Sequence, residues 1–83
     1  MPRRGRRGLR GDQAVRMIAL QVNGRRVELD RPTGLLAYLD TIGVSPRAVA
    51  VEHNGVIIER SGYAEAKLDD GDVVEIVRMV GGG

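Results

Sequence analysis

The 83-residue sequence contains no cysteine, tryptophan or phenylalanine. Without cysteine the chain has no disulfide framework, no thiolate nucleophile and no cysteine-ligated metal site. The lack of Trp and Phe argues against a surface that stacks nucleic-acid bases. No apolar run is long enough to span a bilayer, and the N-terminus lacks the apolar segment of a signal peptide. We therefore expect one small, soluble, cytoplasmic domain without a membrane partner.

Positive charge is concentrated at one end of the chain. Residues 1–16 hold six arginines and one aspartate, a net charge of +5, whereas the rest of the chain has a net charge of −3. An Arg/Gly-rich leader of this kind can bind nucleic acid through phosphate contacts. The favoured interpretation is a disordered extension, or the product of an upstream start codon with Met17 as the effective beginning, because the segment shows no apolar periodicity.

Two hairpins are predicted by alternating apolar residues around Asn-Gly pairs. Residues 17–22 and 25–30 alternate on either side of Asn23-Gly24. Residues 47–53 are predicted as a third strand and residues 56–58 as a short fourth, and Asn54-Gly55 between them indicates that they pair as a hairpin. Both residues of an Asn-Gly pair tolerate positive φ, as a two-residue hairpin turn requires.

A single amphipathic helix of about three turns is predicted after the first hairpin. Its apolar stripe consists of Leu35, Leu36, Leu39 and Ile42, with Thr33 as the expected N-cap. Asp40 and Thr41 are expected on the opposite face. Gly43 is the expected C′ residue, with Val44 folding back on the last turn.

The last third of the chain is predicted to end in a strand. Within residues 61–68 a single helical turn capped by Ser61 is expected. A tight turn follows at Asp69-Asp70-Gly71-Asp72, and then a strand at 73–79. The last strand is too apolar on both faces to be an edge strand, so we expect it beside the first strand and parallel to it, at the centre of the sheet.

The predicted fold class is therefore α+β, with a mixed sheet of four to five strands wrapped around one main helix in residues 17–80. The following residues are expected to pack on the helical stripe: Ile18, Leu20, Val22, Val27, Leu29, Val49, Val51, Val74 and Ile76.

Metal binding and catalysis are not expected from the side chains of this domain. The three aspartates of the 69–72 turn lack the further ligands of a calcium loop and are interpreted as turn formers. His53 is the only histidine and has no cysteine, serine or carboxylate constellation around it in the sequence. We interpret it as a residue at the end of a strand.

The chain ends Val80-Gly81-Gly82-Gly83. Three glycines cannot continue a sheet or start a helix at low cost, so residues 81–83 are expected to form a flexible tail. Such a tail is thin enough to enter a narrow enzyme site with its terminal carboxylate. A frayed terminus without a function is the alternative when the tail is considered alone.

Three stretches together resemble a known family: AVAVEHNG at 48–55, LDDGD at 68–72, and VVEIVRMVGGG at 73–83. They are similar to the sulfur carrier proteins of thiamine biosynthesis, the ThiS family, over residues 17–83. A D-G-D turn, a V-E-I-V strand and a V-G-G-G ending at this spacing are more specific than a Gly-Gly ending alone. The resemblance implies a ubiquitin-like β-grasp fold, which agrees with the element order. The Arg-rich leader departs from the family pattern.

The resemblance further implies a protein substrate rather than an enzyme, with no bound cofactor. An adenylating, E1-like activating enzyme would use ATP to adenylate the carboxylate of Gly83. A persulfide donor would then displace AMP and leave a thiocarboxylate, whose sulfur passes to thiazole synthase. Gly81 and Gly82 would thread through the partner active sites, where side chains would block the approach of attacking groups.

The expected partner-binding surface is the end of the last strand: Val77, Arg78, Met79 and Val80. If Val74 and Ile76 point into the core, alternation turns Val77 and Met79 outward, either as a partner contact or beneath a neighbouring element. Arg78 would steer the tail or pair with an acidic group of the activating enzyme, or would be a solvated charge.

Three other functions remain open. The small subunit of molybdopterin synthase shares the implied fold and chemistry, but its ending usually has prolines before V-S-G-G or a similar stop. Carriers for cysteine synthesis or tRNA thiolation are further alternatives. A small RNA-binding module that uses the basic leader belongs to a different class; it predicts binding that depends steeply on salt, and nucleic acid is not the favoured partner.

Overall fold

The computed structural model describes residues 17–79, and the first predicted hairpin is present. Strand β1 (Ile18–Val22) pairs antiparallel with β2 (Arg25–Leu29), with Leu20 opposite Val27. The turn residues Asn23 and Gly24 have φ values of 52° and 80°. This left-handed geometry is the one that an Asn-Gly hairpin turn requires.

The helix is shorter than predicted and begins without the predicted cap. A short strand β3 (Thr33–Gly34) precedes α2 (Leu35–Thr41), which has seven residues, about two turns. Gly34 occupies the N-cap position without a side-chain cap, and the Thr33 hydroxyl donates instead to the carbonyl of Arg31 at 2.7 Å. The Thr33 prediction was wrong because its backbone is held in a strand pair with Leu68.

The C-terminal end of the helix agrees with the prediction. Gly43 has a φ of 76°, and its N–H donates to the carbonyl of Asp40. The N–H of Val44 donates to the carbonyl of Leu39 at 2.9 Å, and Val44 packs against the core. These two bonds form a Schellman motif, which satisfies carbonyls left open at the end of the helix.

Only half of the predicted apolar stripe is buried. Leu35 and Leu39 are fully buried, but Leu36 is 38% exposed and Ile42 is 44% exposed. Tyr38, which the stripe did not include, is 6% exposed. The helix thus packs on the core through Leu35, Tyr38 and Leu39, at positions i, i+3 and i+4. A helix of seven residues buries only one narrow face.

The second hairpin is also present. Strand β4 (Val49–His53) pairs antiparallel with β5 (Val56–Ile57) across Asn54-Gly55, with His53 opposite Val56. The predicted strand from 47 begins two residues late because Pro46–Ala48 forms a 3₁₀ turn. The side chain of Ser45 accepts a bond from the backbone N–H of Arg47 and caps that turn.

Short elements connect β5 to the last strand. A 3₁₀ turn at Arg60–Gly62 is where the single helical turn was predicted, but Glu59 rather than Ser61 occupies its N-cap position. Strand β6 (Lys67–Leu68) pairs antiparallel with β3. The predicted tight turn at 69–72 is present, with the N–H of Asp72 donating to the carbonyl of Asp69 at 3.2 Å. Strand β7 (Val73–Arg78) follows.

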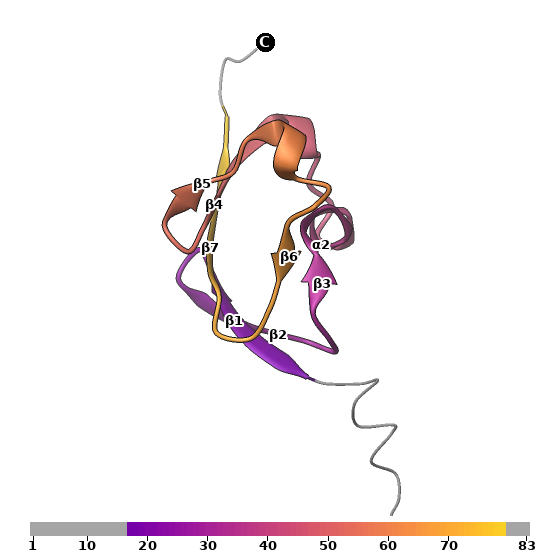
Figure 1. The fold of residues 1–83 in the computed structure, drawn as a ribbon, viewed down its shortest axis with the longest axis vertical. Helices are drawn as coiled ribbons and strands as arrows, with labels where there is room; N and C mark the ends of the chain where they lie inside the picture. The colour runs from indigo at the N-terminus through magenta and orange to yellow at the C-terminus, as the bar shows by residue number, and fades with distance from the viewer. Residues whose placement is uncertain (1–16, 80–83) are drawn as a thin grey trace, which may run out of the picture.

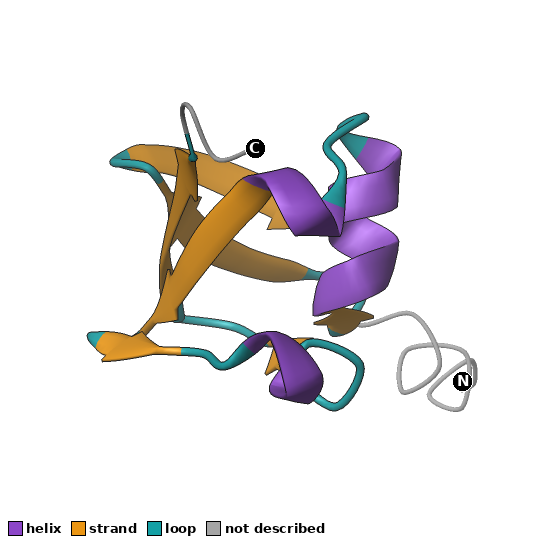
Figure 2. Cartoon of the chain, turned by 90° about the horizontal axis from the view of Figure 1, so that it is seen from above, coloured by secondary structure: helices purple, strands orange, loops and turns teal. Residues whose placement is uncertain are grey.

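The five main strands form one mixed sheet in the order β2-β1-β7-β4-β5 (Figure 1). Strands β1 and β7 are parallel neighbours at the centre of this sheet, as predicted. Figure 2 shows the sheet curving around the side on which α2 lies. Within residues 17–79 no helix has the length and hydrophobicity needed to cross a membrane.

The core lies between the sheet, α2 and the β3–β6 pair. Among residues 17–79 it comprises eleven buried residues: Ile18, Leu20, Val22, Leu35, Tyr38, Leu39, Val49, Val51, Tyr63, Leu68 and Val74. The predicted core residues Val27, Leu29 and Ile76 are partly buried against it. Tyr63 and Leu68 were not predicted. The hydroxyl of Tyr63 donates to the carbonyl of Val49 at 3.1 Å, which lets a polar group lie inside the core.

Candidate functional site

The candidate site is the C-terminal end of β7, from which the chain continues toward residue 83. Val80, Gly81, Gly82 and Gly83 lie outside the described residues, and Met79 is the last residue of the site that the structure describes. On the β4 side the N–H of Met79 donates to the carbonyl of Ala48 at 2.8 Å. The central strand is therefore paired with β4 as far as the last described residue.

Alternation along β7 places apolar side chains on the outer face of the sheet. Val74 is fully buried, whereas Val77 and Met79 are 58% and 44% exposed. Arg78 is exposed as well. The prediction that Val77 and Met79 point outward is confirmed, and neither is covered by an element within residues 17–79.

Ile57 enlarges this surface and was missed by the sequence prediction. Glu52 lies opposite both Ile57 and Glu75, and Ala50 lies opposite Val77, so Ile57 shares the outer face of the sheet with Val77. Its side chain is 71% exposed. The sequence did contain a signal for this exposure, namely three consecutive apolar residues in a short strand after a polar turn. A strand at the edge of a sheet cannot bury all three side chains.

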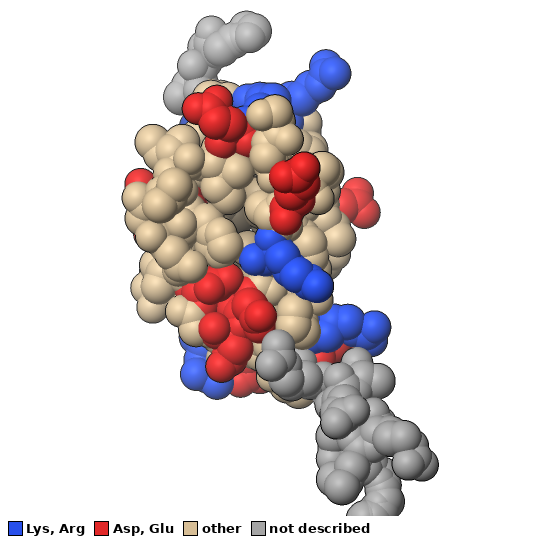
Figure 3. Space-filling model, in the orientation of Figure 1, with Lys and Arg blue, Asp and Glu red and all other residues tan. Residues whose placement is uncertain are grey.

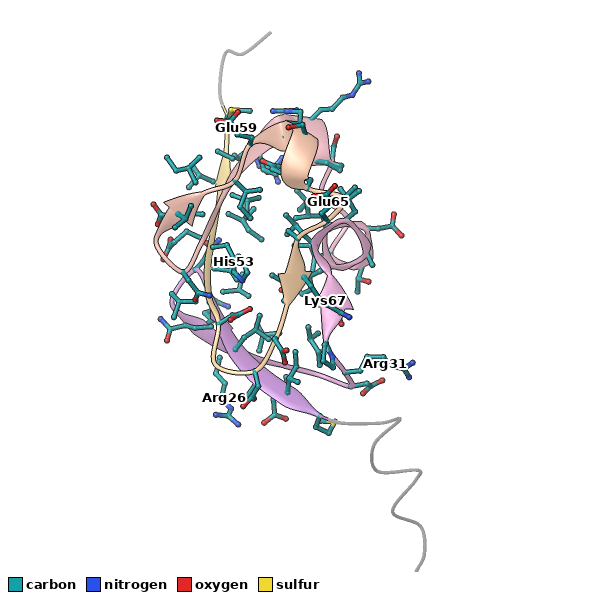
Figure 4. All side chains as sticks on the ribbon, viewed as in Figure 1. Arg26, Arg31, His53, Glu59, Glu65 and Lys67 are labelled. Atoms are coloured by element: carbon teal, nitrogen blue, oxygen red, sulfur yellow. The ribbon has the colours of Figure 1, made fainter. Side chains whose placement is uncertain are left out.

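Ile57, Val77 and Met79 define what we name the tail-side patch. Ile57 and Met79 line one surface hollow, together with Val49, Ala50, Ile58, Glu59, Arg60 and Tyr63. Figure 3 shows a broad area without charged side chains over β5, and Figure 4 places Glu59 near the end of β7. An exposed apolar surface with a charged rim is typical of a protein-interaction site.

The opposite end of β7 carries a polar cluster around Asp72. Its Oδ2 atom lies 2.8 Å from Nε2 of His53 and accepts the backbone N–H of Asp69 at 2.8 Å. Its Oδ1 atom accepts from Nδ2 of Asn54 at 3.1 Å. The fold thus places a carboxylate beside His53 that the local sequence did not indicate. His53 does lie at the end of β4, as predicted.

These contacts give the aspartates of the turn a structural role. The backbone N–H of Ala19 donates to Oδ1 of Asp70 at 2.8 Å, which ties the turn to β1. Figure 3 shows acidic side chains gathered at this end of the molecule. Residues 17–79 contain no group of three His, Cys, Asp or Glu side chains arranged to hold a metal ion.

The same contacts shift the pKa of Asp72. Burial alone would raise this pKa, but the hydrogen bonds from His53, Asn54 and the Asp69 backbone, with the charge of His53, outweigh it and hold the pKa below its ordinary value. A carboxyl group with a lowered pKa stabilises the fold above the pKa of the unfolded chain, and this contribution is lost as the pH falls through the folded pKa.

We therefore expect Asp72→Asn to destabilise the protein at pH 7 and to flatten the fall of stability below about pH 4. Urea unfolding of both proteins between neutral and acid pH measures this difference. Parallel pH profiles for the two proteins would contradict the assignment, since they would show that Asp72 does not cause the acid dependence.

A mixed sheet that curves around one helix, with parallel terminal strands at its centre and the chain leaving from the last of them, is a ubiquitin-like β-grasp domain. The model of the ThiS family matches residues 16–83. The chain belongs to this family.

Individual relatives agree with the family match. The chain is 42% identical over 65 residues to "Sulfur carrier protein ThiS" of Bacillus subtilis, covering 77% of this chain and 98% of that one. It is 41% identical over 64 residues to "Thiazole synthase" of Paramagnetospirillum magneticum, covering 77% of this chain but only 20% of that one. The chain therefore spans about a fifth of the length of this larger relative.

A solved structure shows the same fold. The crystal structure of the thiamine biosynthesis protein ThiS from Geobacter metallireducens has a TM-score of 0.70 and 32% identity to this chain. The superposition covers 80% of this chain and all of that one. The expected ubiquitin-like fold is thus confirmed.

Proposed function

We propose that the chain is a sulfur carrier of thiamine biosynthesis whose reactive group is the carboxylate of Gly83. Membership of the ThiS family over residues 16–83, which includes the glycine ending, carries this proposal. The names of the bacterial relatives concern sulfur carriage, thiazole and thiamine. They favour this pathway over molybdopterin synthesis and the other carriers that the sequence left open.

The proposed reaction uses the main-chain terminus of the carrier and the active sites of its partners. An adenylating enzyme would join the Gly83 carboxylate to AMP from ATP and release pyrophosphate, which makes the carbonyl carbon a good electrophile. The outer sulfur of a cysteine persulfide would attack this carbon and displace AMP. The thiolate of a further partner cysteine would then attack the sulfur of the donor cysteine, form a disulfide with it and release the thiocarboxylate on Gly83.

The glycine tail suits this chemistry. A glycine residue has no side chain to shield its carbonyl carbon, so both the nucleophile and the leaving group have access to Gly83. Gly81 and Gly82 are proposed to thread the narrow approach to each partner active site. The carrier itself is proposed to have no catalytic residue, no metal and no bound cofactor, and to work in the cytoplasm.

Thiazole synthase is the proposed acceptor of the sulfur. The match to one segment of a protein named thiazole synthase supports this choice, because a carrier-like segment and a synthase share one chain there. The tail-side patch, with Arg78 and Val80, is proposed as the docking surface for the partner enzymes. It lies where the tail leaves the domain, so a partner bound there has the tail within reach.

The test is the intact mass of the protein after incubation with ATP, a persulfide donor and a competent adenylating enzyme. We expect a gain equal to the difference between one sulfur and one oxygen atom. A variant that lacks Gly82 and Gly83 is the control and is expected to show no gain. An unchanged mass for the full chain, with an enzyme that loads another carrier, would contradict the proposal.

A further inference from the structure

The asparagines of both hairpin turns also form hydrogen bonds with β7. The Oδ1 atom of Asn23 accepts from the backbone N–H of Ile76 at 2.7 Å, and its Nδ2 donates to the carbonyl of Ile76 at 3.1 Å. The Oδ1 atom of Asn54 accepts from the backbone N–H of Val73 at 2.8 Å. The two turns thus hold the last strand at two different points along its length.

Asn23 extends the parallel pairing of β1 with β7. The backbone pairing ends at Val22 opposite Val74, followed by a bond of 2.8 Å from the N–H of Asn23 to the carbonyl of Val74. The next peptide group of β7 on this side belongs to Ile76, but β1 has already turned into the hairpin. The side-chain amide of Asn23 has the donor and acceptor of a peptide group and takes the missing place.

Between Ile76 and Met79, the last described residue, β7 forms backbone hydrogen bonds on one side only. Alternate residues of a strand direct their backbone groups to opposite neighbours, and Met79 bonds to Ala48 on the β4 side. The backbone groups of Arg78 therefore face the side that β1 has left. Within residues 17–79, Asn23 forms the last hydrogen bonds of β7 on that side.

We propose that Asn23 is a positioning residue for sulfur transfer, because its amide fixes the C-terminal half of β7, the strand that precedes the tail. This inference rests on the proposed function. A strand end that is ordered beforehand saves the partner enzyme the free energy of ordering it on binding. Its loss should weaken productive binding without changing the chemical step, which belongs to the enzyme.

Two matched glycine variants separate this role from general stability. Glycine adopts the left-handed geometry of Asn23 without strain, so Asn23→Gly removes the amide and keeps the turn. Asn54→Gly is the control, since Asn54 has a φ of 54° against 52° for Asn23 and also bonds a backbone N–H of β7. The two variants differ in position: Asn54→Gly removes a hydrogen bond at the start of β7, whereas Asn23→Gly removes hydrogen bonds near its end.

The experiment combines kinetics with hydrogen exchange. For Asn23→Gly we expect KM for the carrier in thiocarboxylate formation to rise about fivefold, with kcat nearly unchanged. Hydrogen exchange should become faster at the amides of Ile76 and Met79. For Asn54→Gly we expect faster exchange at Val73, slow exchange at Met79 and a nearly unchanged KM.

The failures of the two proposals are distinguishable. If the wild type is loaded and Asn23→Gly has the same KM, or if Asn54→Gly raises KM equally, the positioning role is wrong. If the wild type gains no sulfur, the proposed function is wrong and this role in it is lost as well. If Asn23→Gly does not fold, Asn23→Asp is the second variant. It keeps the acceptor for the N–H of Ile76 but places an oxygen against the carbonyl of Ile76. A raised KM for this variant supports the positioning role of Asn23, and an unchanged KM overturns it.

Discussion

Replacing Leu39 with alanine is expected to lower the free energy of unfolding by about 3 kcal/mol. The side chain is fully buried where α2 packs beneath the sheet, so the substitution removes apolar contacts and leaves a cavity. A domain of this size has a total stability on the order of 5 kcal/mol. The variant should therefore be close to unfolding at physiological temperature, which urea titration followed by circular dichroism measures.

Leu36→Ala is the matched control for Leu39→Ala. The same substitution is made on the same helix, but Leu36 is 38% exposed, so we expect a loss of about 1 kcal/mol or less. Equal losses for the two variants would show that α2 docks by the whole predicted stripe instead of by its Leu35, Tyr38 and Leu39 face.

Replacing both Val77 and Met79 with serine is expected to weaken binding to thiazole synthase at least tenfold. The loss of central apolar contacts typically costs an interface about 1.4 kcal/mol or more, which corresponds to this factor. Both side chains are more than two-fifths exposed, so the fold itself should lose little. Isothermal titration with the synthase measures the affinity, and thermal unfolding measures the stability. This prediction depends on the proposed docking surface.

Ile42→Ser provides the control for this double variant. Ile42 is 44% exposed, the same fraction as Met79, but lies after α2 instead of on the outer face of the sheet. We expect its affinity for the synthase to equal that of the wild type. If Ile42→Ser weakens binding as much as the double variant, the loss reflects surface hydrophobicity in general and the tail-side patch is not the docking surface.

The local features of the fold were predictable from the sequence because each depends on a few adjacent residues. Asn23-Gly24 and Asn54-Gly55 form the two turns, Gly43 ends the helix, and alternation assigns the faces of the strands. The outward direction of Val77 follows from the same alternation. The central, parallel position of the last strand was also predicted, from its apolar residues on both faces.

Features that depend on distant partners were predicted wrongly or not at all. Thr33 looks like a cap in the sequence, but pairing with Leu68 holds it in a strand. Tyr63 and Tyr38 are amphipathic residues whose burial depends on what surrounds them, and Tyr63 is buried where it can donate to Val49. The exposure of Ile57 follows from its edge position, which only the completed sheet defines.

The turns, the order of the main helix and the five main strands, the family resemblance and the glycine ending follow from the sequence alone, because these reside in short runs of residues. Packing in three dimensions determines which face of α2 is buried and which apolar residues gather at the C-terminal end of β7. It also determines that the amide of Asn23 completes the pairing of β7, through a bond between residues 53 positions apart. Burial and hydrogen bonding depend on neighbours in space, and local sequence patterns do not contain those neighbours.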